Sequence, residues 1–437
     1  MRTPRPAFVT TVLAAPLILV SWAAAQTSPA LTTLHFFAGP PDGELPVAGL
    51  VAGANGVFYG TTKFGGAYGN GSVYQLTAPA AGGSWTETLL YSFKGPTVND
   101  GEWPYASLVI GNDGSLYGTT LEGGAVDTCG SSRCGGTVFK LSPPRTSSGK
   151  WTETVLHSFP SADGDGTGPW GGLVIGANGA LYGTTQTGGI ESTPESFGYG
   201  TVFEMTPPAA QGGAWTETVL YRFNGANGDG YGPVSNLVFG ATRELYGTTP
   251  SGGSAGFGTV FELTPPGATG RTWTETILYN FSGQAPDGGE PSSAVVIGKD
   301  GWLYGTAGNP SSALCTVFEL KPPAASGGLW SENTLYTFEK SLENQNGFAP
   351  NGLVFGANGL LYGTAMLGGA SDLGNVYQLE PAAGGTWTYT VLYSFDGTDG
   401  SLPNGVPIVG SDGNLYGTTH RGNTSQVNMG TVFQLVP

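Results

Sequence analysis

An acidic turn recurs seven times along the chain. Its pattern is Asp or Asn, then Gly, two variable residues and Pro, and the first position is Asp42, Asp100, Asp165, Asp229, Asp287, Asn346 or Asp399. One interpretation is a local turn in which the carboxylate accepts backbone N–H bonds. The other is a ring of acids at the mouth of a channel that binds a cation such as calcium, which needs several oxygen ligands. Asp163, Asp165 and Asp229 have suggestive spacing, but none completes a calcium-loop motif.

Aromatic residues stand beside the repeated acid in four copies: Trp103, Trp170, Tyr231 and Phe348. A flat ring beside a carboxylate suits a sugar, whose C–H face stacks on the ring while its hydroxyl groups donate hydrogen bonds. We therefore hypothesise a glycan site that includes Asp100, Asp165 and Asp229. The alternative is that these rings cap the fold hydrophobically.

Histidine and glutamate give no catalytic constellation. His35 and His157 occupy a position where sister repeats have tyrosine, which indicates packing, and His420 alone makes neither a triad nor a metal site. Five glutamates recur in the repeated Trp-Thr-Glu-Thr motif or its variant: Glu87, Glu153, Glu217, Glu275 and Glu332. A residue found in nearly every repeat serves the repeat, so we predict no catalytic residue.

The three cysteines are few enough to be considered one by one. Cys129 and Cys134 lie in a long loop, and in an exported protein this spacing favours a local disulfide. Cys315 replaces the glycine of a recurring Gly-Thr-Val-Phe strand, and we expect a buried thiol there.

Seven repeats account for almost all of the chain after residue 28. The marker is Leu-Tyr-Gly-Thr-Thr or a close variant, and its tyrosines are Tyr59, Tyr117, Tyr182, Tyr246, Tyr304, Tyr362 and Tyr416. The spacings run from 54 to 65 residues. Each copy contains four short runs rich in β-branched and aromatic residues, separated by turn residues. Four strands per unit in seven units predict an all-β, seven-bladed β-propeller.

The two ends of the chain predict how the ring closes. The last copy stops after its third strand, whereas residues 31–37 form an orphan fourth strand, so we expect the N-terminal strand to complete blade seven and remove an unpaired edge. The predicted organisation is one domain over residues 26–437. Its blades lie at about 46–93, 104–159, 169–223, 233–281, 291–338, 350–395 and 403–437.

The repeat unit resembles the bacterial tandem repeats called GloVer repeats. Their hallmark is similar to Asp-Gly-x-Leu-Tyr-Gly-Thr-Thr followed by Gly-Thr-Val-Phe-x-Leu, and residues 412–419 with 430–435 match it best here. The resemblance covers nearly the whole chain after the N-terminal segment. It implies an extracytoplasmic location, as in many such proteins, but no established activity and no catalytic residue.

Composition and the N-terminus limit location and partners. The chain has 15 Lys and Arg against 31 Asp and Glu, so neither nucleic acid nor an anionic membrane surface is an expected partner. Arg2 and Arg5, an apolar run from Phe8 to Trp22 and a small-residue stretch ending at Ala25 predict a signal peptide over residues 1–25. We expect a secreted or periplasmic monomer without a membrane span after cleavage.

Two classes of function remain open from the sequence. The first is a non-catalytic binding or surface-interaction propeller without a cofactor, whose partner is a carbohydrate or another surface protein. Its binding face carries the long loops at residues 121–135 and 186–199, and we expect a neutral glycan there. The alternative is a carbohydrate lyase or a lactonase at the mouth of the channel. A lactonase needs acids and a metal converging on the axis, and a lyase needs a tyrosine or histidine base beside a cationic clamp.

Overall fold

The structure is a computed structural model. It describes residues 29–80, 83–125, 135–146, 149–160, 164–190, 197–210, 212–267, 272–308, 312, 314–325, 328–339, 346–422 and 429–437. The described residues contain no α-helix, and their two helical turns are 3₁₀ turns at Pro96–Val98 and Ala383–Gly385. None of the described segments forms a helix long and apolar enough to cross a membrane.

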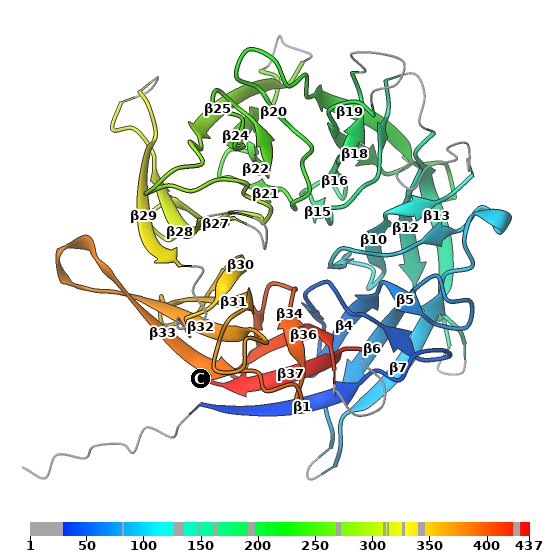
Figure 1. Ribbon diagram of the computed structural model, residues 1–437. Coiled ribbons are helices and arrows are strands. Elements are labelled where there is room, and N and C mark those ends of the chain that lie inside the picture. Colours follow the sequence, from blue (N-terminus) through cyan, green and yellow to red (C-terminus); the bar gives the residue numbers. More distant parts are fainter. Residues whose placement is uncertain are drawn as a thin grey trace, which may run out of the picture.

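Seven antiparallel sheets form a ring around a common axis (Figure 1), which confirms the predicted seven-bladed propeller. In blades one to six the strands pair in chain order, with the fourth strand at the periphery. Blade one is β3 (Val51–Ala52), β4 (Val57–Thr62), β6 (Ser72–Thr77) and β7 (Thr86–Ser92), and blade two is β9 (Val109–Ile110), β10 (Leu116–Thr120), β12 (Thr137–Ser142) and β13 (Thr152–Ser158).

The next four blades repeat this pattern. Blade three is β15 (Val174–Ile175), β16 (Leu181–Thr185), β18 (Thr201–Thr206) and β19 (Thr216–Arg222), and blade four is β21 (Val238–Phe239), β22 (Leu245–Thr249), β24 (Thr259–Thr264) and β25 (Thr274–Asn280). Blade five is β26 (Val296–Ile297), β27 (Leu303–Ala307), β28 (Cys315–Lys321) and β29 (Ser331–Phe338). Blade six is β30 (Phe348–Phe355), β31 (Leu361–Leu367), β32 (Asn375–Pro381) and β33 (Trp387–Ser394).

Blade seven closes the ring with both ends of the chain. Its C-terminal strands are β34 (Ser401–Pro403), β35 (Ile408–Val409), β36 (Leu415–Arg421) and β37 (Thr431–Val436). Strand β1 (Ala30–Phe36) runs antiparallel beside β37, from Ala30 opposite Val436 to Phe36 opposite Thr431. Figure 1 shows these two strands side by side at opposite ends of the colour range. The predicted closure by the N-terminal strand is thus confirmed.

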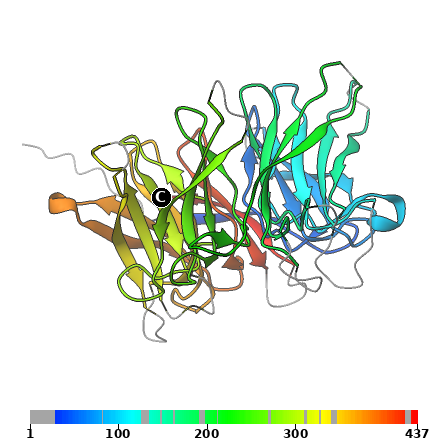
Figure 2. The ribbon, with the colours of Figure 1, turned by 90° about the horizontal axis from the view of Figure 1, so that it is seen from above.

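Four two-residue ribbons extend the blades beyond their main sheets. They pair β2 (Gly43–Glu44) with β5 (Phe64–Gly65), β8 (Gly101–Glu102) with β11 (Glu122–Gly123), β14 (Gly166–Thr167) with β17 (Thr187–Gly188), and β20 (Gly230–Tyr231) with β23 (Ser251–Gly252). In the view from above, loops project from both edges of the ring (Figure 2). In each ribbon, residues of the acidic turn pair with residues just after the second strand of the blade. The acidic turns and the loops that join second to third strands therefore lie on the same face of the ring.

The recurring glycine of the second strand allows close packing inside each blade. Gly183 on β16 pairs with Phe203 on β18, whose ring is fully buried. A Cβ atom on Gly183 would lie 2.6 Å from Phe203 Cζ and 3.0 Å from Leu173 Cδ2, which is too close for an undisturbed side chain. The glycine thus leaves room for the core aromatic of the third strand.

The first threonine of the marker connects neighbouring blades near the axis. Thr61 donates a hydrogen bond to the carbonyl of Ala106 at 3.1 Å, and Thr119 donates one to that of Gly171 at 3.0 Å. Thr418 does the same to Ala48 at 2.8 Å, across the closure of the ring. Because the acceptors precede the innermost strands, these bonds position the segments that line the axial channel.

Candidate functional site

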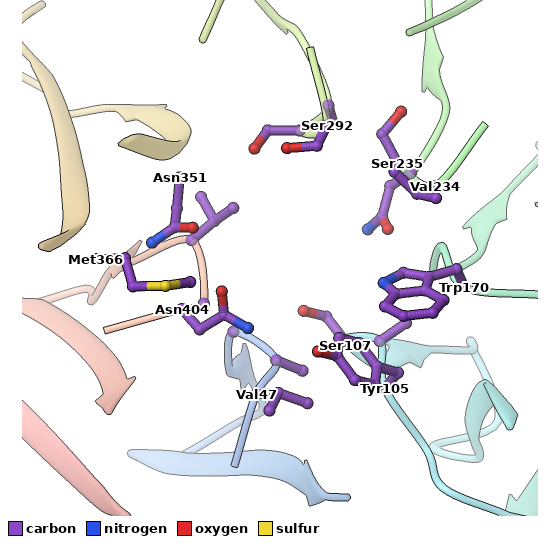
Figure 3. A pocket seen from close by; sticks show the side chains of 18 of the residues that line it. Val47, Tyr105, Ser107, Trp170, Val234, Ser235, Ser292, Asn351, Met366 and Asn404 are labelled. Carbon is purple, nitrogen blue, oxygen red and sulfur yellow. The ribbon is translucent and has the colours of Figure 1, made fainter. Parts of the chain in front are cut away.

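A pocket of about 330 Å³ lies on the axis of the ring, where segments of all seven blades converge. The described lining residues carry no charged side chain; hydroxyl and amide groups from Ser107, Asn236, Asn351 and Asn404 stand among small apolar residues. In Figure 3 their side chains are arranged around an open centre. The pocket therefore suits an uncharged ligand with hydrogen-bonding groups.

One position of the repeat supplies a ring of lining residues. The residue directly after the proline of each acidic turn lines the pocket in every copy: Val47, Tyr105, Trp170, Val234, Ser292, Asn351 and Asn404. The turn ends at this proline and the innermost strand follows, so the position faces the axis in every blade. The chemistry of the pocket thus varies from copy to copy, while the backbone that carries it is repeated.

Two aromatic rings form one wall of the pocket. Tyr105 precedes β9, and Trp170 precedes β15 on the next blade. Their ring centroids are 4.5 Å apart, with an interplanar angle of 47°. Figure 3 shows both side chains beside Ser107, across the pocket from Asn351 and Met366. Burial raises the pKa of Tyr105, so its hydroxyl keeps its proton and can donate a hydrogen bond.

Two amide side chains of the pocket are partly held by the fold. Asn351 Nδ2 donates to the carbonyl of Pro403 at 2.7 Å and to Thr364 Oγ1 at 3.1 Å. Asn236 Oδ1 accepts a bond from the backbone N–H of Gly172 at 2.6 Å. Among the described residues, neither Asn351 Oδ1 nor Asn236 Nδ2 takes part in a hydrogen bond, so each amide can offer this atom to a ligand.

A lysine stands next to the aromatic wall. Lys63 follows β4, and its Nζ lies 4.9 Å from the ring centroid of Phe64, 5.5 Å from that of Trp103 and 5.2 Å from that of Tyr105. Burial lowers the pKa of Lys63, and the charge of Glu122 acts in the opposite direction. His420, at the corresponding position on β36, has a pKa lowered by burial and by the charges of Arg421 and Lys63. The ammonium group of Lys63 thus lies near the pocket, although Lys63 is not among its described lining residues.

The structure places the four predicted aromatic residues in different environments. Trp170 lines the pocket, and Trp103 packs against Phe64 and Lys63 close to it. Tyr231 is 39% exposed and contacts Tyr199 outside the pocket, whereas Phe348 is 4% exposed and belongs to the hydrophobic core. Phe348 is therefore not accessible to a ligand.

The acidic positions hold turns and connect blades. Asp100 Oδ1 accepts a bond from the backbone N–H of Gly101 at 2.7 Å, and its Oδ2 accepts bonds from the backbone of Lys94 at 2.8 Å and the hydroxyl of Tyr91 at 2.7 Å. Asp165 accepts a bond from the backbone N–H of Gly166 and pairs with the ring of His157. Asp229 accepts bonds from the backbone N–H of Asn224 and the hydroxyl of Tyr221. None of the seven acidic or amide positions lines the axial pocket, which agrees with the turn interpretation.

The glutamates of the fourth strands face the acidic turn that precedes their own blade in the chain. Burial, and then the charge of the facing aspartate, raises the pKa of Glu87, Glu153 and Glu217 to about 7 and that of Glu275 to about 8. Oε1 of each of these four glutamates is buried and has no hydrogen-bond partner among the described residues. Sequence analysis did not pair them, because the turn and the fourth strand lie at opposite ends of one repeat and only the folded blade brings them together.

Some predicted sites lie outside the described residues: Asp163 and the predicted disulfide partners Cys129 and Cys134. Cys315, on β28, is fully buried, as expected.

The fold and the axial pocket define a seven-bladed propeller with an uncharged central site. The chain belongs to the Gloeobacter/Verrucomicrobia repeat family, whose model matches residues 20–211, 127–342 and 311–437. No curated protein matches the sequence.

Solved structures with similar folds include several propeller proteins. An ulvan lyase of a polysaccharide lyase family is 10% identical, with a TM-score of 0.51 over 92% of this chain and 95% of that one. The soluble aldose sugar dehydrogenase of Escherichia coli is 13% identical, with a TM-score of 0.45 over 94% and 100%. A protein of unknown function from Dyadobacter fermentans is 10% identical, with a TM-score of 0.46 over 93% and 98%. At these identities the likeness shows the fold alone.

Proposed function

We propose that this protein is a non-catalytic binding propeller and that its axial pocket holds a neutral glycan. The observation that carries the proposal is the pair of rings, Tyr105 and Trp170, at the wall of an uncharged pocket. Sugars stack their C–H faces on such rings and exchange hydrogen bonds with amide and hydroxyl groups. The side chains of Asn236, Asn351 and Asn404 offer these groups.

The size of the pocket limits the part of the glycan that enters. Small-molecule sites have volumes of about 300–1,000 Å³, and this pocket is at the lower end of that range. We infer that one terminal sugar enters and that the rest of the glycan lies over the adjoining face. Gly308 lines the pocket and directly follows the second strand of blade five, so it belongs to the loop set that joins second and third strands. This supports our proposal that the glycan binds on the face that carries the loops at 121–135 and 186–199.

A glycan array probed with the protein and with a Trp170→Ala variant tests the proposal. We expect neutral glycans to be retained by the protein and to bind the variant at least about tenfold more weakly, since losing one stacking contact costs about 1.4 kcal/mol. Val234→Ala changes the same repeat position on another wall and serves as the matched control, and Tyr231→Ala tests an exposed ring outside the pocket. Unchanged binding by Trp170→Ala, at an unchanged melting temperature, would contradict the proposal.

A carbohydrate lyase is the second candidate, and one feature favours it. The ammonium group of Lys63 lies beside the ring of Tyr105, and the lowered pKa of His420 keeps that imidazole neutral, as a general base must be. In such an enzyme the lysine would neutralise a uronate carboxylate and the base would take the proton from the carbon next to it. A C=C bond would then form as the C–O bond to the leaving sugar breaks, and the leaving oxygen would take up a proton from water. No lining residue described here is an acid, so the pocket does not offer the converging carboxylates that a lactonase requires.

Incubation with uronate-containing polysaccharides distinguishes the two candidates. A lyase would generate the ultraviolet absorbance of an unsaturated sugar, and that signal would disappear in Lys63→Ala. We expect binding of neutral glycans and no such absorbance. Turnover that requires Lys63 would replace the binding proposal with the lyase.

We further propose that the protein works outside the cytoplasm as a monomer. The signal-peptide pattern supports export, with the mature chain beginning at Gln26. N-terminal sequencing of the protein isolated from its host tests this, and an N-terminus at Met1 in the mature protein would contradict it.

A further inference from the structure

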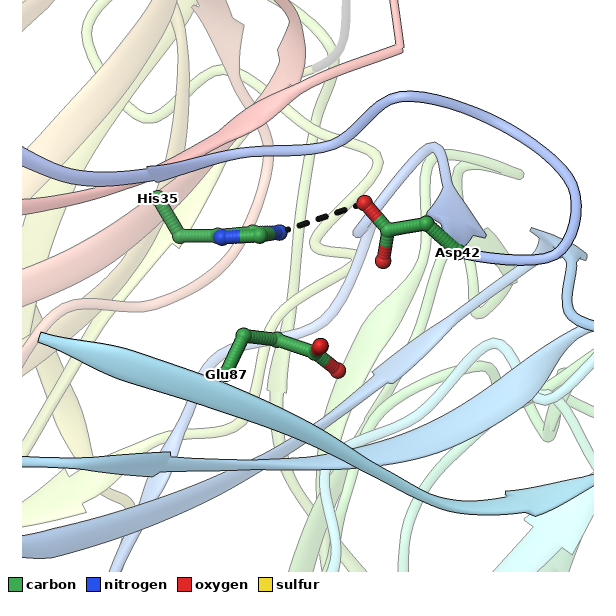
Figure 4. Close-up of side chains that lie close together, drawn as sticks. All are labelled: His35, Asp42 and Glu87. Carbon is green, nitrogen blue, oxygen red and sulfur yellow. Dashed lines mark hydrogen bonds and ion pairs between the residues drawn. The ribbon is translucent and has the colours of Figure 1, made fainter.

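A second cluster of chemically active groups lies far from the axis, where the ring closes. His35 on β1, Asp42 in the acidic turn and Glu87 on β7 each offer one donor atom, and these three atoms all lie within 4.8 Å of one another. Figure 4 shows the three side chains pointing toward a common centre from three separate segments. No other group of three such residues in the described part of the chain meets this condition.

We propose that His35, Asp42 and Glu87 bind a divalent transition-metal ion of the zinc type. One imidazole nitrogen and two carboxylates form a three-residue ligand set that leaves a fourth, tetrahedral position for water. Calcium fits poorly, because it requires six to eight oxygen ligands.

The distances agree with this assignment. The His35 Nε2 and Asp42 Oδ2 atoms are 3.3 Å apart. Two ligand atoms on a tetrahedral zinc ion with bonds of about 2.0–2.1 Å are separated by about 3.3 Å, so this pair already has the required spacing. A carboxylate oxygen of Glu87 is the third donor, and Oε1 of this carboxylate is buried and has no hydrogen-bond partner among the described residues.

The surroundings hold the first two ligands in place. Asp42 accepts bonds from the backbone N–H groups of Ala38 at 3.0 Å and Gly43 at 2.6 Å. The ring of His35 packs edge-on against Phe37, with centroids 4.7 Å apart. Such outer contacts orient metal ligands. The side chains of His35 and Asp42 are 22% and 20% exposed, which leaves access for an ion.

The sister clusters explain why this junction differs from most others. At the next junction Tyr91 stands in place of the histidine and donates its hydroxyl proton to Asp100 at 2.7 Å, and Glu153 stands in place of Glu87. A protonated phenol is not a zinc ligand, whereas an imidazole is. The chain thus contains, in its own repeats, a metal-free version of the same cluster.

An ion at this junction would connect the closing strand to blade one. His35 belongs to the strand that completes blade seven, and Glu87 belongs to the outer strand of blade one. Because the three ligands meet only in the folded ring, a metal ion that binds them would stabilise the folded state relative to the unfolded chain.

Zinc binding by the untagged full chain tests the inference. The protein is stripped with chelator, equilibrated with Zn²⁺ and assayed for bound metal and for its melting temperature; Co²⁺ absorption then reports tetrahedral coordination. We expect one tightly bound zinc per chain and a higher melting temperature with zinc. His35→Tyr and Glu87→Gln should each weaken binding by at least about tenfold.

The controls separate loss of the site from loss of the fold. His35→Tyr recreates the sister cluster, so in chelator it should melt at the temperature of the original protein. His157→Tyr changes the only other histidine paired with an acidic turn, and it should leave zinc binding unchanged. Absence of zinc binding, equal binding by His35→Tyr, or equal loss in His157→Tyr would each overturn the inference.

Discussion

Replacing Glu275 with glutamine should remove part of the pH dependence of stability. Burial, and then the charge of Asp229, raises the pKa of Glu275 from 4.5 to about 8 in the folded protein. The unfolded chain therefore ionises at lower pH than the folded one, so the stabilising contribution is complete below about pH 4.5 and is lost as the pH rises through about 8. Because glutamine cannot ionise, the Glu275→Gln variant should not lose this stability as the pH rises.

The size of the effect follows from the shift. One pKa unit corresponds to about 1.4 kcal/mol, so the full shift would correspond to about 5 kcal/mol. Glu275 is only partly buried, and solvent reduces the effect to about 2 kcal/mol. For a chain of this length that is about 2 °C in melting temperature.

Calorimetric melting between about pH 5 and about pH 9 measures the effect. The difference in melting temperature, Glu275→Gln minus the original protein, should increase by about 2 °C over this pH range. The control is Glu262→Gln on β24, where Glu262 accepts a bond from Thr264 at the surface and does not face an acidic turn; it should keep the original slope. An equal slope in Glu275→Gln would refute the assignment of a buried, neutral glutamic acid at this junction.

Three further predictions concern the fold. Gly183→Ala should lower the free energy of unfolding by about 2 kcal/mol, because its Cβ would press on Phe203; an unchanged denaturant midpoint would contradict this. Deleting residues 26–38 should lower the melting temperature far more than removing a surface loop, since it exposes the edge of β37, and equal melting temperatures would contradict closure by β1. Alkylation of the unfolded, unreduced protein should label one of the three cysteines if Cys129 and Cys134 form the disulfide predicted from the sequence; three labels would contradict that prediction.

The fold could be predicted because each blade carries its own complete signal. The repeated marker, the strand-forming runs and the turn residues recur at nearly constant spacing, and the orphan strand at residues 31–37 has a counterpart missing at the other end. Observed β1 covers Ala30–Phe36. These features are local, or concern only the order of repeats, so a single sequence is enough to reveal them.

The site was harder to predict, because it is formed by one residue from each of seven copies. Trp170 was identified, but its neighbour Tyr105 was not, although both follow the proline of an acidic turn. Alignment of the seven copies at this proline would have revealed the variable ring. The pair Asp42 and Glu87 was missed because the two residues lie at opposite ends of one repeat, and only the folded blade brings their side chains together.

The central claim is that a neutral glycan stacks on Trp170 in the axial pocket. Heteronuclear NMR of protein labelled with ¹⁵N in its tryptophans tests this directly, with the Trp170 indole signal assigned from its absence in Trp170→Phe. On titration with a neutral glycan retained on the array, the Trp170 signal should shift in a saturable way while that of Trp151, on blade two outside the pocket, stays in place. Binding of the glycan with an unshifted Trp170 signal would contradict the claim.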